Sequence, residues 1–204
     1  MSKSASLLKN ENENGNSRSL EGKMLVASPH MNDPFFEKSL VYICAHDDNG
    51  IIGIIVNQQI GMVSIVDMLK NSGNNKKPKA INKKYPVLFG GPVNSDLIVA
   101  LSLTKTQEVS FSEHRRADMH ADAGTFLQDV IHGKNKPSKL ILAKGVSAWD
   151  ADQLESEISE NAWFVIDPSL QMLFSQRIKH KWDTVMKGLG VSNMNYLVHY
   201  SGNA

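Results

Sequence analysis

The sequence predicts an α+β fold in a single compact domain. Segments with the periodicity of strands and segments with the periodicity of helices are intermixed along the chain. Several strand-like segments are joined by tight turns, which favours antiparallel pairing over a doubly wound parallel sheet. Hydrophobic residues make up 41% of the 204 residues, which is enough to build a core, so a globally disordered chain is excluded.

We expect residues 1–22 to be a disordered N-terminal tail and residues 23–204 to form the domain. The tail is dominated by Ser, Asn, Lys and Glu, which offer few groups to bury. Within the domain, residues 71–84 are rich in Asn and Lys and predict an exposed loop.

The first half of the domain is expected to form strands with one helix among them. Short apolar or alternating runs bounded by turn residues predict strands at 24–27, 39–46, 51–57, 87–89 and 97–103. Because the turn sequence Asp48-Asn49-Gly50 separates the second strand from the third, residues 39–57 are predicted to form a β-hairpin. Residues 63–70 have apolar residues at helical spacing and Ser64 as an N-cap, which predicts a helix.

The second half is expected to alternate helices with strands. The predicted order is helix 125–132, strand 139–143, helix 150–160, strand 163–166 and helix 178–189. Gly133 and Gly190 follow the first and the last of these helices, where glycine commonly ends a helix. The helix at 150–160 is amphipathic, with Leu154 and Ile158 toward the core and acidic residues outward.

The charge balance disfavours a dedicated nucleic-acid-binding protein. Lys and Arg total 22 against 21 Asp and Glu, a net charge of +1, whereas such proteins usually carry a strongly basic face. The basic clusters at 76–84 and 114–116 leave local phosphate contact open, although solvated loops are the favoured interpretation.

We expect a cytoplasmic protein with no membrane segment. The first residues lack the apolar stretch of a signal peptide, and the most apolar run, residues 51–56, is too short to cross a bilayer. The single cysteine, Cys44, cannot form an internal disulfide, which fits a reducing compartment.

Cys44 and His46 lie two apart on a predicted strand and would share one face with Leu40 and Tyr42. They could be two metal ligands or a thiol beside a base. The favoured interpretation is a small buried Cys beside a hydrogen-bonded His. No second Cys completes a zinc pattern, so we expect no metal site.

No sequence signature of catalysis is present. The chain contains no Gly-x-Ser-x-Gly, Ser-x-x-Lys, Walker, Rossmann or His-Glu-x-x-His pattern. We therefore expect no catalytic residues and no cofactor, and an enzymatic activity is disfavoured.

The turn Gly90-Gly91-Pro92 allows two interpretations. Bare backbone amides there could bind an anion, but a tight structural turn between strands is favoured. Trp149 and Gln153 open the acidic helix, where a Trp more often anchors the core than binds a ligand.

Several segments in a fixed order resemble the YqgE/AlgH family of bacterial proteins. The set covers nearly all of the chain after the tail and consists of Met24-Leu25-Val26-Ala27-Ser28-Pro29, Asp33-Pro34-Phe35-Phe36, the strand from Ser39 to His46, Gly50, Gly53, Val56-Asn57, Gly90-Gly91-Pro92-Val93, Gly145 through Trp149 to Ile158, Asn161-Ala162-Trp163, Trp182, Leu189-Gly190 and the terminal Gly202-x-Ala204. The resemblance implies a single α+β domain built on a crossed β-meander with packed helices, in a cytoplasmic bacterial protein. The family is often labelled as transcriptional regulators, and the resemblance carries no established enzymatic activity.

The sequence departs from the family pattern at two places. Gly145-Val146-Ser147-Ala148-Trp149 stands where the family usually has Gly-Tyr-x-Gly-Trp, and Ser102 stands where a His is often found. These departures weigh against a catalytic role for those positions.

The leading hypothesis is a non-enzymatic regulatory or interaction protein with a protein partner. Only the family label suggests nucleic acid as a partner, and the charge balance does not support it. The alternative is a small-molecule-binding or thiol redox-responsive protein. Its candidate ligand-binding residues come from segments that the fold could bring together; they are Cys44, His46, Asn57, Gly90, Gly91, Pro92, Trp149 and Gln153.

Overall fold

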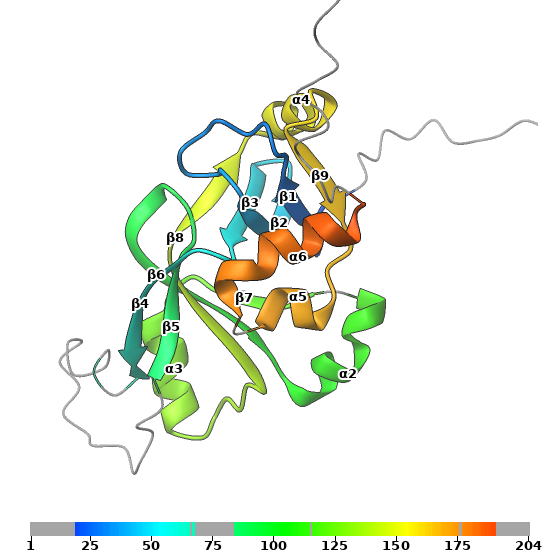
Figure 1. The fold of residues 1–204 in the computed structure, drawn as a ribbon. Coiled ribbons are helices and arrows are strands. Elements are labelled where there is room, and N and C mark those ends of the chain that lie inside the picture. Colours follow the sequence, from blue (N-terminus) through cyan, green and yellow to red (C-terminus); the bar gives the residue numbers. More distant parts are fainter. Residues whose placement is uncertain (1–18, 66, 68–83, 115, 176, 191–204) are drawn as a thin grey trace, which may run out of the picture.

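One long strand, β8 (Lys139–Trp149), organises the sheet (Figure 1). The computed structural model describes residues 19–190 except 66, 68–83, 115 and 176. In these residues nine strands form one sheet in the order β4-β5-β8-β3-β2-β1-β9, with β6 paired to β8 and β7. The other strands are β1 (Met24–Ala27), β2 (Leu40–Asp47), β3 (Gly50–Ile55), β4 (Gln59–Ser64), β5 (Lys84–Phe89), β6 (Val93–Leu103), β7 (Asp118–His120) and β9 (Trp163–Ile166).

β8 belongs to two groups of strands because its two halves have different neighbours. Its first half pairs in parallel with β5 and antiparallel with β6. Its second half pairs antiparallel with β3, which continues into the antiparallel meander β3-β2-β1-β9. The predicted hairpin of residues 39–57 is confirmed, with Asp47 opposite Gly50.

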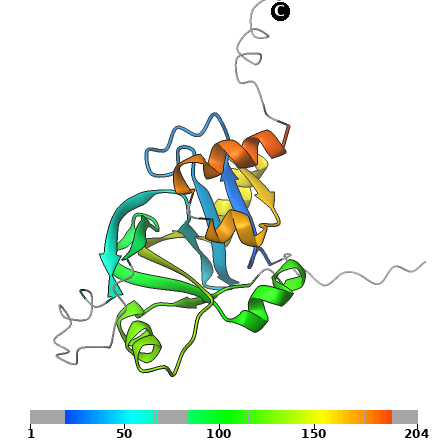
Figure 2. The same ribbon diagram turned by 60° about the horizontal axis from the view of Figure 1, so that its bottom comes forward.

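Five α-helices and one 3₁₀ helix in the described part of the chain cover the sheet. They are α2 (Lys105–His114), α3 (Ala123–Ile131), α4 (Ala151–Ser159), α5 (Leu170–Phe174), the 3₁₀ helix η1 (Ile178–His180) and α6 (Lys181–Gly188). α2 and α3 lie at the lower side of Figure 2, while α6 lies over the meander at the top.

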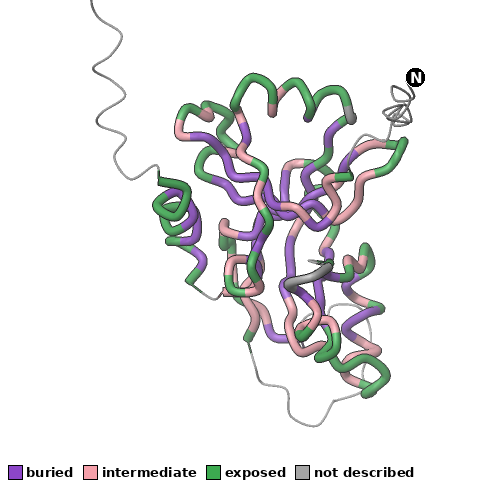
Figure 3. Tube along the Cα trace, turned by 90° about the vertical axis from the view of Figure 1, so that its right-hand side faces the viewer, coloured by how far each residue is buried: buried purple, intermediate pink, exposed green. Residues whose placement is uncertain are grey.

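Strand alternation divides the buried residues of the meander between two layers. Met24, Val26 and Tyr42 belong to a first apolar cluster with residues of α5 and α6. Leu25 and Val41, one residue out of step with these, belong to a second cluster with residues of α4 and β9. The purple segments in Figure 3 follow the strands, and the green segments follow the outer faces of the helices.

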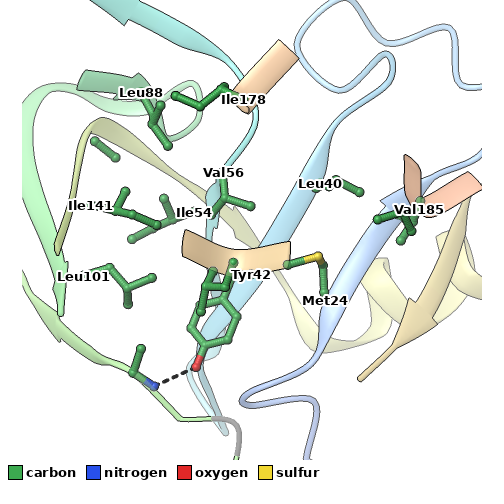
Figure 4. Close-up of a cluster of buried hydrophobic side chains, with 14 of the residues drawn as sticks. Met24, Leu40, Tyr42, Ile54, Val56, Leu88, Leu101, Ile141, Ile178 and Val185 are labelled. Carbon is green, nitrogen blue, oxygen red and sulfur yellow. Dashed lines mark hydrogen bonds between the residues drawn. The ribbon is translucent and has the colours of Figure 1, made fainter. Parts of the chain in front are cut away.

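The first cluster also joins the two groups of strands that meet at β8. Figure 4 shows Tyr42 of β2 among Ile54, Leu101 and Ile141, which come from β3, β6 and β8. The Tyr42 hydroxyl oxygen accepts a hydrogen bond of 2.8 Å from the Ala117 N–H, and burial raises the pKa of this tyrosine well above its ordinary value. A third cluster packs α3 against β6 and β8.

The α+β prediction is confirmed, and the main corrections concern the lengths of elements. Residues 63 and 64 belong to β4 rather than to a helix; residues 65 and 67 are helical, and the rest of 63–70 lies outside the described residues. Lys84 belongs to β5, and the remainder of the predicted 71–84 loop is also outside them.

The predicted helix at 178–189 is η1 followed by α6, and β8 extends six residues beyond its predicted end. The elements α2, α5, β4 and β7 were not predicted. In α2 the apolar residues Val109 and Phe111 lie two apart, so they form no helical stripe that could signal the helix.

The structure describes the chain from residue 19, four residues before the predicted start of the domain at residue 23. Residues 19–22 pack against β2, because the Gly22 N–H donates to the Ile43 carbonyl oxygen at 2.9 Å. Residues 1–18 and 191–204 lie outside the described residues.

Candidate functional site

Cys44 and His46 are held in different surroundings. A β-bulge between Ile43 and Ala45 leaves Cys44 without a partner residue on β3, which breaks the alternation that was predicted to place both side chains on one face. Cys44 packs against the first cluster, and its thiol donates to the Tyr42 carbonyl oxygen at 3.7 Å. His46 Nδ1 instead accepts a hydrogen bond of 2.9 Å from the Leu20 N–H.

The Cys44 thiol has the environment of a structural cysteine. Burial raises its pKa well above the ordinary value, and the negative charge of Glu21 raises it further. Since the thiolate is the reactive form, a thiol held protonated in this way is a poor nucleophile and a poor redox sensor.

Asn57 fastens the loop that precedes β2. Its Oδ1 accepts from the Leu40 N–H and its Nδ2 donates to the Lys38 carbonyl oxygen, both at 2.8 Å. These bonds occupy the amide from both ends, so Asn57 acts as a bridge between β3 and the start of β2.

The Gly90-Gly91-Pro92 turn is a place where two backbones touch. The Gly90 N–H donates to the Lys144 carbonyl oxygen at 2.8 Å, and the Gly90 carbonyl oxygen accepts from Ile55 N–H and from Ser147 Oγ. A Cβ atom on Gly90 would overlap the Gly145 carbonyl oxygen, and one on Gly91 would overlap the backbone of Val146. The geometry therefore gives these glycines the role of close packing against β8.

Trp149 and Gln153 meet at one carboxylate, that of Glu157. The indole N–H groups of Trp149 and Trp163 both donate to Glu157 Oε2, at 3.2 and 2.7 Å. Gln153 Nε2 donates to Glu157 Oε1 at 2.8 Å. Phe36 stacks on Trp149 with the ring centroids 5.4 Å apart and meets Trp163 edge-on.

This cluster joins β8, α4, β9 and the loop before β2 into one layer. Trp149 and Trp163 are buried, and Glu157 satisfies the polar N–H of each. Trp149 is thus a core anchor, as the favoured interpretation of the sequence had it, and the carboxylate of Glu157 is engaged in holding the two rings.

A hydroxyl and an imidazole lie within hydrogen-bonding distance at the edge of the sheet. Ser102 Oγ is 2.9 Å from His120 Nε2, and the His120 ring stacks on Phe126 with centroids 3.7 Å apart. Burial lowers the pKa of His120, with the Asp118 charge acting in the opposite direction. Asp118 accepts from Gln107 and forms no hydrogen bond with His120 in the described structure, so the three side chains do not form the relay of a serine hydrolase.

Among the described residues, no three His, Cys, Asp or Glu side chains are grouped so as to hold a metal ion. Of the helices described, none has the length and apolar character to span a membrane. The predicted candidate residues lie in five places, which are Cys44, His46, Asn57, the Gly90-Gly91-Pro92 turn, and Trp149 with Gln153. Trp149 and Gln153 also line a cavity beside β3.

Comparison with known proteins agrees with this architecture. A model of the AlgH-like family matches residues 24–194. The chain belongs to the AlgH-like family. A UPF0301 protein of Aliivibrio salmonicida is 35% identical over 86% of this chain and 95% of its own length. A UPF0301 protein of Paracoccus denitrificans is also 35% identical, over 86% of this chain and 92% of its own length.

Two solved structures share the fold of this AlgH-like chain. The solution structure of the AlgH protein from Pseudomonas aeruginosa superposes with a TM-score of 0.63 at 24% identity, covering 95% of this chain and all of that one. A crystal structure from Corynebacterium diphtheriae gives 0.61 at 23% identity, covering 82% and 86%. At these identities the likeness concerns the fold.

The AlgH-like domain presents apolar side chains on the edge strand β4. Ile60 and Met62, two residues apart, are each 54% exposed. β4 pairs with β5 on one side and with no other strand in the described residues. Phe35, itself 48% exposed, stacks on Phe89 at the end of β5, and its carbonyl oxygen accepts from Gln58 just before β4.

We name Phe35, Ile60 and Met62 the apolar edge. It was not predicted, because residues 59–62 carry no clean alternation and residues 63–70 have the apolar spacing of a helix. Glu157 was also missed as the centre of its cluster. Its spacing of four from Gln153 on a predicted helix was the available signal.

Proposed function

We propose that the chain is a non-enzymatic interaction protein of the cytoplasm that binds another protein along β4. The observation that carries this proposal is the pair Ile60 and Met62, exposed on a strand whose outer side has no partner strand in the described residues. An edge strand with exposed apolar side chains is usually blunted or covered, because it otherwise invites pairing with another chain.

The chemistry of β4 favours an extended segment as the binding element of the partner. A strand added to a sheet edge gains main-chain hydrogen bonds, and alternate side chains supply specificity. Met62 lies opposite Pro86, whereas Ile60 is the extra residue of a β-bulge between Gln59 and Gly61, so the two side chains do not follow regular alternation. Both are exposed, and Phe35 extends the apolar surface at the start of β4.

A protein is favoured over nucleic acid as the partner. The net charge is +1, so electrostatics supply no general attraction to phosphate. The family label of transcriptional regulator is compatible with a role exerted through a protein contact, and we assign the regulatory role on that basis.

Small-molecule binding or thiol chemistry near Cys44 and the Gly90-Gly91-Pro92 turn receives no support from the geometry. The thiol pKa is raised, and the glycine backbones are packed against β8. This alternative is not favoured at that place in the fold.

The test compares two exposed apolar positions, one on β4 and one away from it on α2. A photo-reactive amino acid replaces Met62 in one protein and Val109, which is 85% exposed on α2, in the other. Each is irradiated in a lysate of the source cell with and without nuclease, and adducts are identified by mass spectrometry.

We expect a protein adduct at position 62 that survives nuclease, is absent at position 109, and is lost when Ile60→Lys is added. An adduct with a second copy of the chain would identify self-association instead. Equal labelling at both positions, or none at position 62, would contradict the proposal.

A further inference from the structure

A cavity of about 440 Å³ opens between β5, the start of β8, and the segment from α5 to α6. Its size falls within the range of about 300–1,000 Å³ that small-molecule sites occupy. It lies apart from Cys44 and the glycine turn, none of which lines it.

A buried lysine, Lys181, forms part of the lining. It is 6% exposed, and its Nζ donates to the carbonyl oxygens of Val56 and Leu173, both at 2.9 Å. An ammonium group carries three donors, and no carboxylate or third acceptor is found for it in the part of the chain that the structure describes. Burial lowers its pKa to about 8, so the group is still mostly charged at neutral pH.

The charged residues that line the cavity are all lysines. Lys84, Lys136 and Lys139 join Lys181 in the lining, and no Asp or Glu lines it. Lys139 has a partner outside the lining, Glu108, at 3.3 Å. Within the described residues no ion pair is formed by Lys84, Lys136 or Lys181, so the cavity retains an uncompensated positive charge.

The rest of the lining is partly apolar. Leu88, Ile141 and Ile178 are buried residues of the first cluster that reach the cavity, and Figure 4 shows Leu88 and Ile178 near each other at one end of that cluster. Ser138 and Ser175 also line the cavity, with the Ser138 hydroxyl donating to the Leu103 carbonyl oxygen at 3.1 Å. A ligand matching this wall would combine an anionic group with an apolar body.

We propose that this cavity binds a small organic anion, with its carboxylate or phosphate group toward Lys181 and the rim lysines and its apolar part against Leu88, Ile141 and Ile178. This inference does not depend on the proposed contact at β4, which involves other residues. The alternative is that Lys181 only clamps α6 to β3 and α5 through its two carbonyl bonds.

The test uses small aromatic probes that differ in charge. The full chain is titrated with phenyl phosphate, benzoate, benzyl alcohol and benzylamine while backbone amide signals are followed by NMR. We expect saturable shifts with the two anions at residues of the lining, such as Tyr85, Ser138 and Ser175, and weaker or no binding of the neutral and cationic probes. Shifts with all four probes alike, or shifts that map elsewhere, would overturn the proposal.

Variants then separate binding from folding. The pair Lys84→Gln and Lys136→Gln is expected to weaken phenyl phosphate binding about tenfold, since each partly exposed ion pair contributes up to about fivefold. The control pair, exposed Lys105→Gln and Lys187→Gln outside the lining, should leave the affinity unchanged. Equal weakening in both pairs would show that net charge alone attracts the anion and would contradict a built site.

Lys181→Met addresses the buried group directly. Loss of anion binding with a retained native amide spectrum is expected. Retained affinity in this variant would assign Lys181 to the structural clamp alone and would overturn its place in the site. If the variant does not fold, the rim pair and its control still decide the proposal.

Discussion

The burial of Lys181 should make the stability of the whole domain depend on pH. Its folded-state pKa is about 8 against an ordinary 10.5, so between these values the unfolded chain binds more protons than the folded one. The free energy of unfolding should therefore rise with pH in this window, by up to about 3 kcal/mol from this group. Below about pH 8 the Lys181 ammonium group is charged while buried, which lowers the free energy of unfolding.

Urea unfolding of the wild type and of Lys181→Met across this pH range measures the effect. Cys44 and Tyr42, whose pKa values are raised by burial, act in the opposite direction as pH passes their ordinary values. Because both proteins contain these two groups, the difference between the curves isolates Lys181. Parallel curves would show that its pKa is not lowered.

Glu157 is only partly buried, but we expect its carboxylate to contribute strongly to the stability of the fold. Glu157→Leu leaves the indole N–H groups of Trp149 and Trp163 without their acceptor, which should lower the free energy of unfolding by at least about 1–3 kcal/mol. Glu157→Gln keeps a carbonyl acceptor and should lose clearly less. Chemical unfolding followed by tryptophan fluorescence compares the two, and equal losses would show that the indoles do not need this oxygen.

At the scale of elements, the contact between the Gly90-Gly91 turn and β8 sets how closely the strands approach. Gly90→Ala would drive its Cβ into the Gly145 carbonyl oxygen, and hydrogen bonds from Gly90 to Lys144 and from Ile55 to Gly90 hold the turn against its neighbours. We expect a loss of more than about 3 kcal/mol in the free energy of unfolding.

Gly61→Ala on β4 is the matched control. No atom lies within 4 Å of a Cβ at that position, so the stability should change by no more than about 1 kcal/mol. Thermal unfolding of both variants checks the difference. A mild effect at Gly90 would show that the two backbones are less closely packed than this geometry requires.

At the scale of the molecule, β8 and the first cluster bind the two groups of strands into one cooperative unit. Leu101 of β6 is fully buried in that cluster, and the tryptophans Trp149, Trp163 and Trp182 are contributed by β8, β9 and α6. Leu101→Ala should cost about 2–5 kcal/mol and should shift the unfolding transition reported by tryptophan fluorescence.

Far-UV circular dichroism and tryptophan fluorescence should then give coincident transitions in both the wild type and Leu101→Ala. Two separate transitions, with fluorescence unaffected by Leu101→Ala, would mean that the groups of strands on either side of β8 unfold independently.

Local sequence patterns were sufficient for most of the strands and for two helices. The strand at 163–166 was predicted to the residue, and the hairpin between β2 and β3 followed from its turn residues. The helix at 150–160 followed from its apolar stripe and corresponds to α4. In these elements the residues that decide the structure lie within one turn or one strand of each other.

The elements that the sequence did not predict depend on distant partners. β4 forms because it pairs with β5, although its own residues suggested a helix from 63 onward. The second half of β8 forms because β3 pairs with it, beyond the predicted end of the strand at residue 143.

By itself the sequence determined the fold class, the family and the absence of catalytic signatures, because these depend on residue types and their local order. Only the tertiary structure decided what the candidate residues do. A bulge separates Cys44 from His46, and the Gly90-Gly91 turn packs against the backbone of β8. The side chains of Trp149, Trp163 and Gln153 all donate hydrogen bonds to Glu157. The tertiary structure also placed Lys181, Lys84 and Lys136 around one cavity, although they are far apart in the chain. Burial and side-chain contacts between distant segments arise only when the chain packs, so no local pattern contains them.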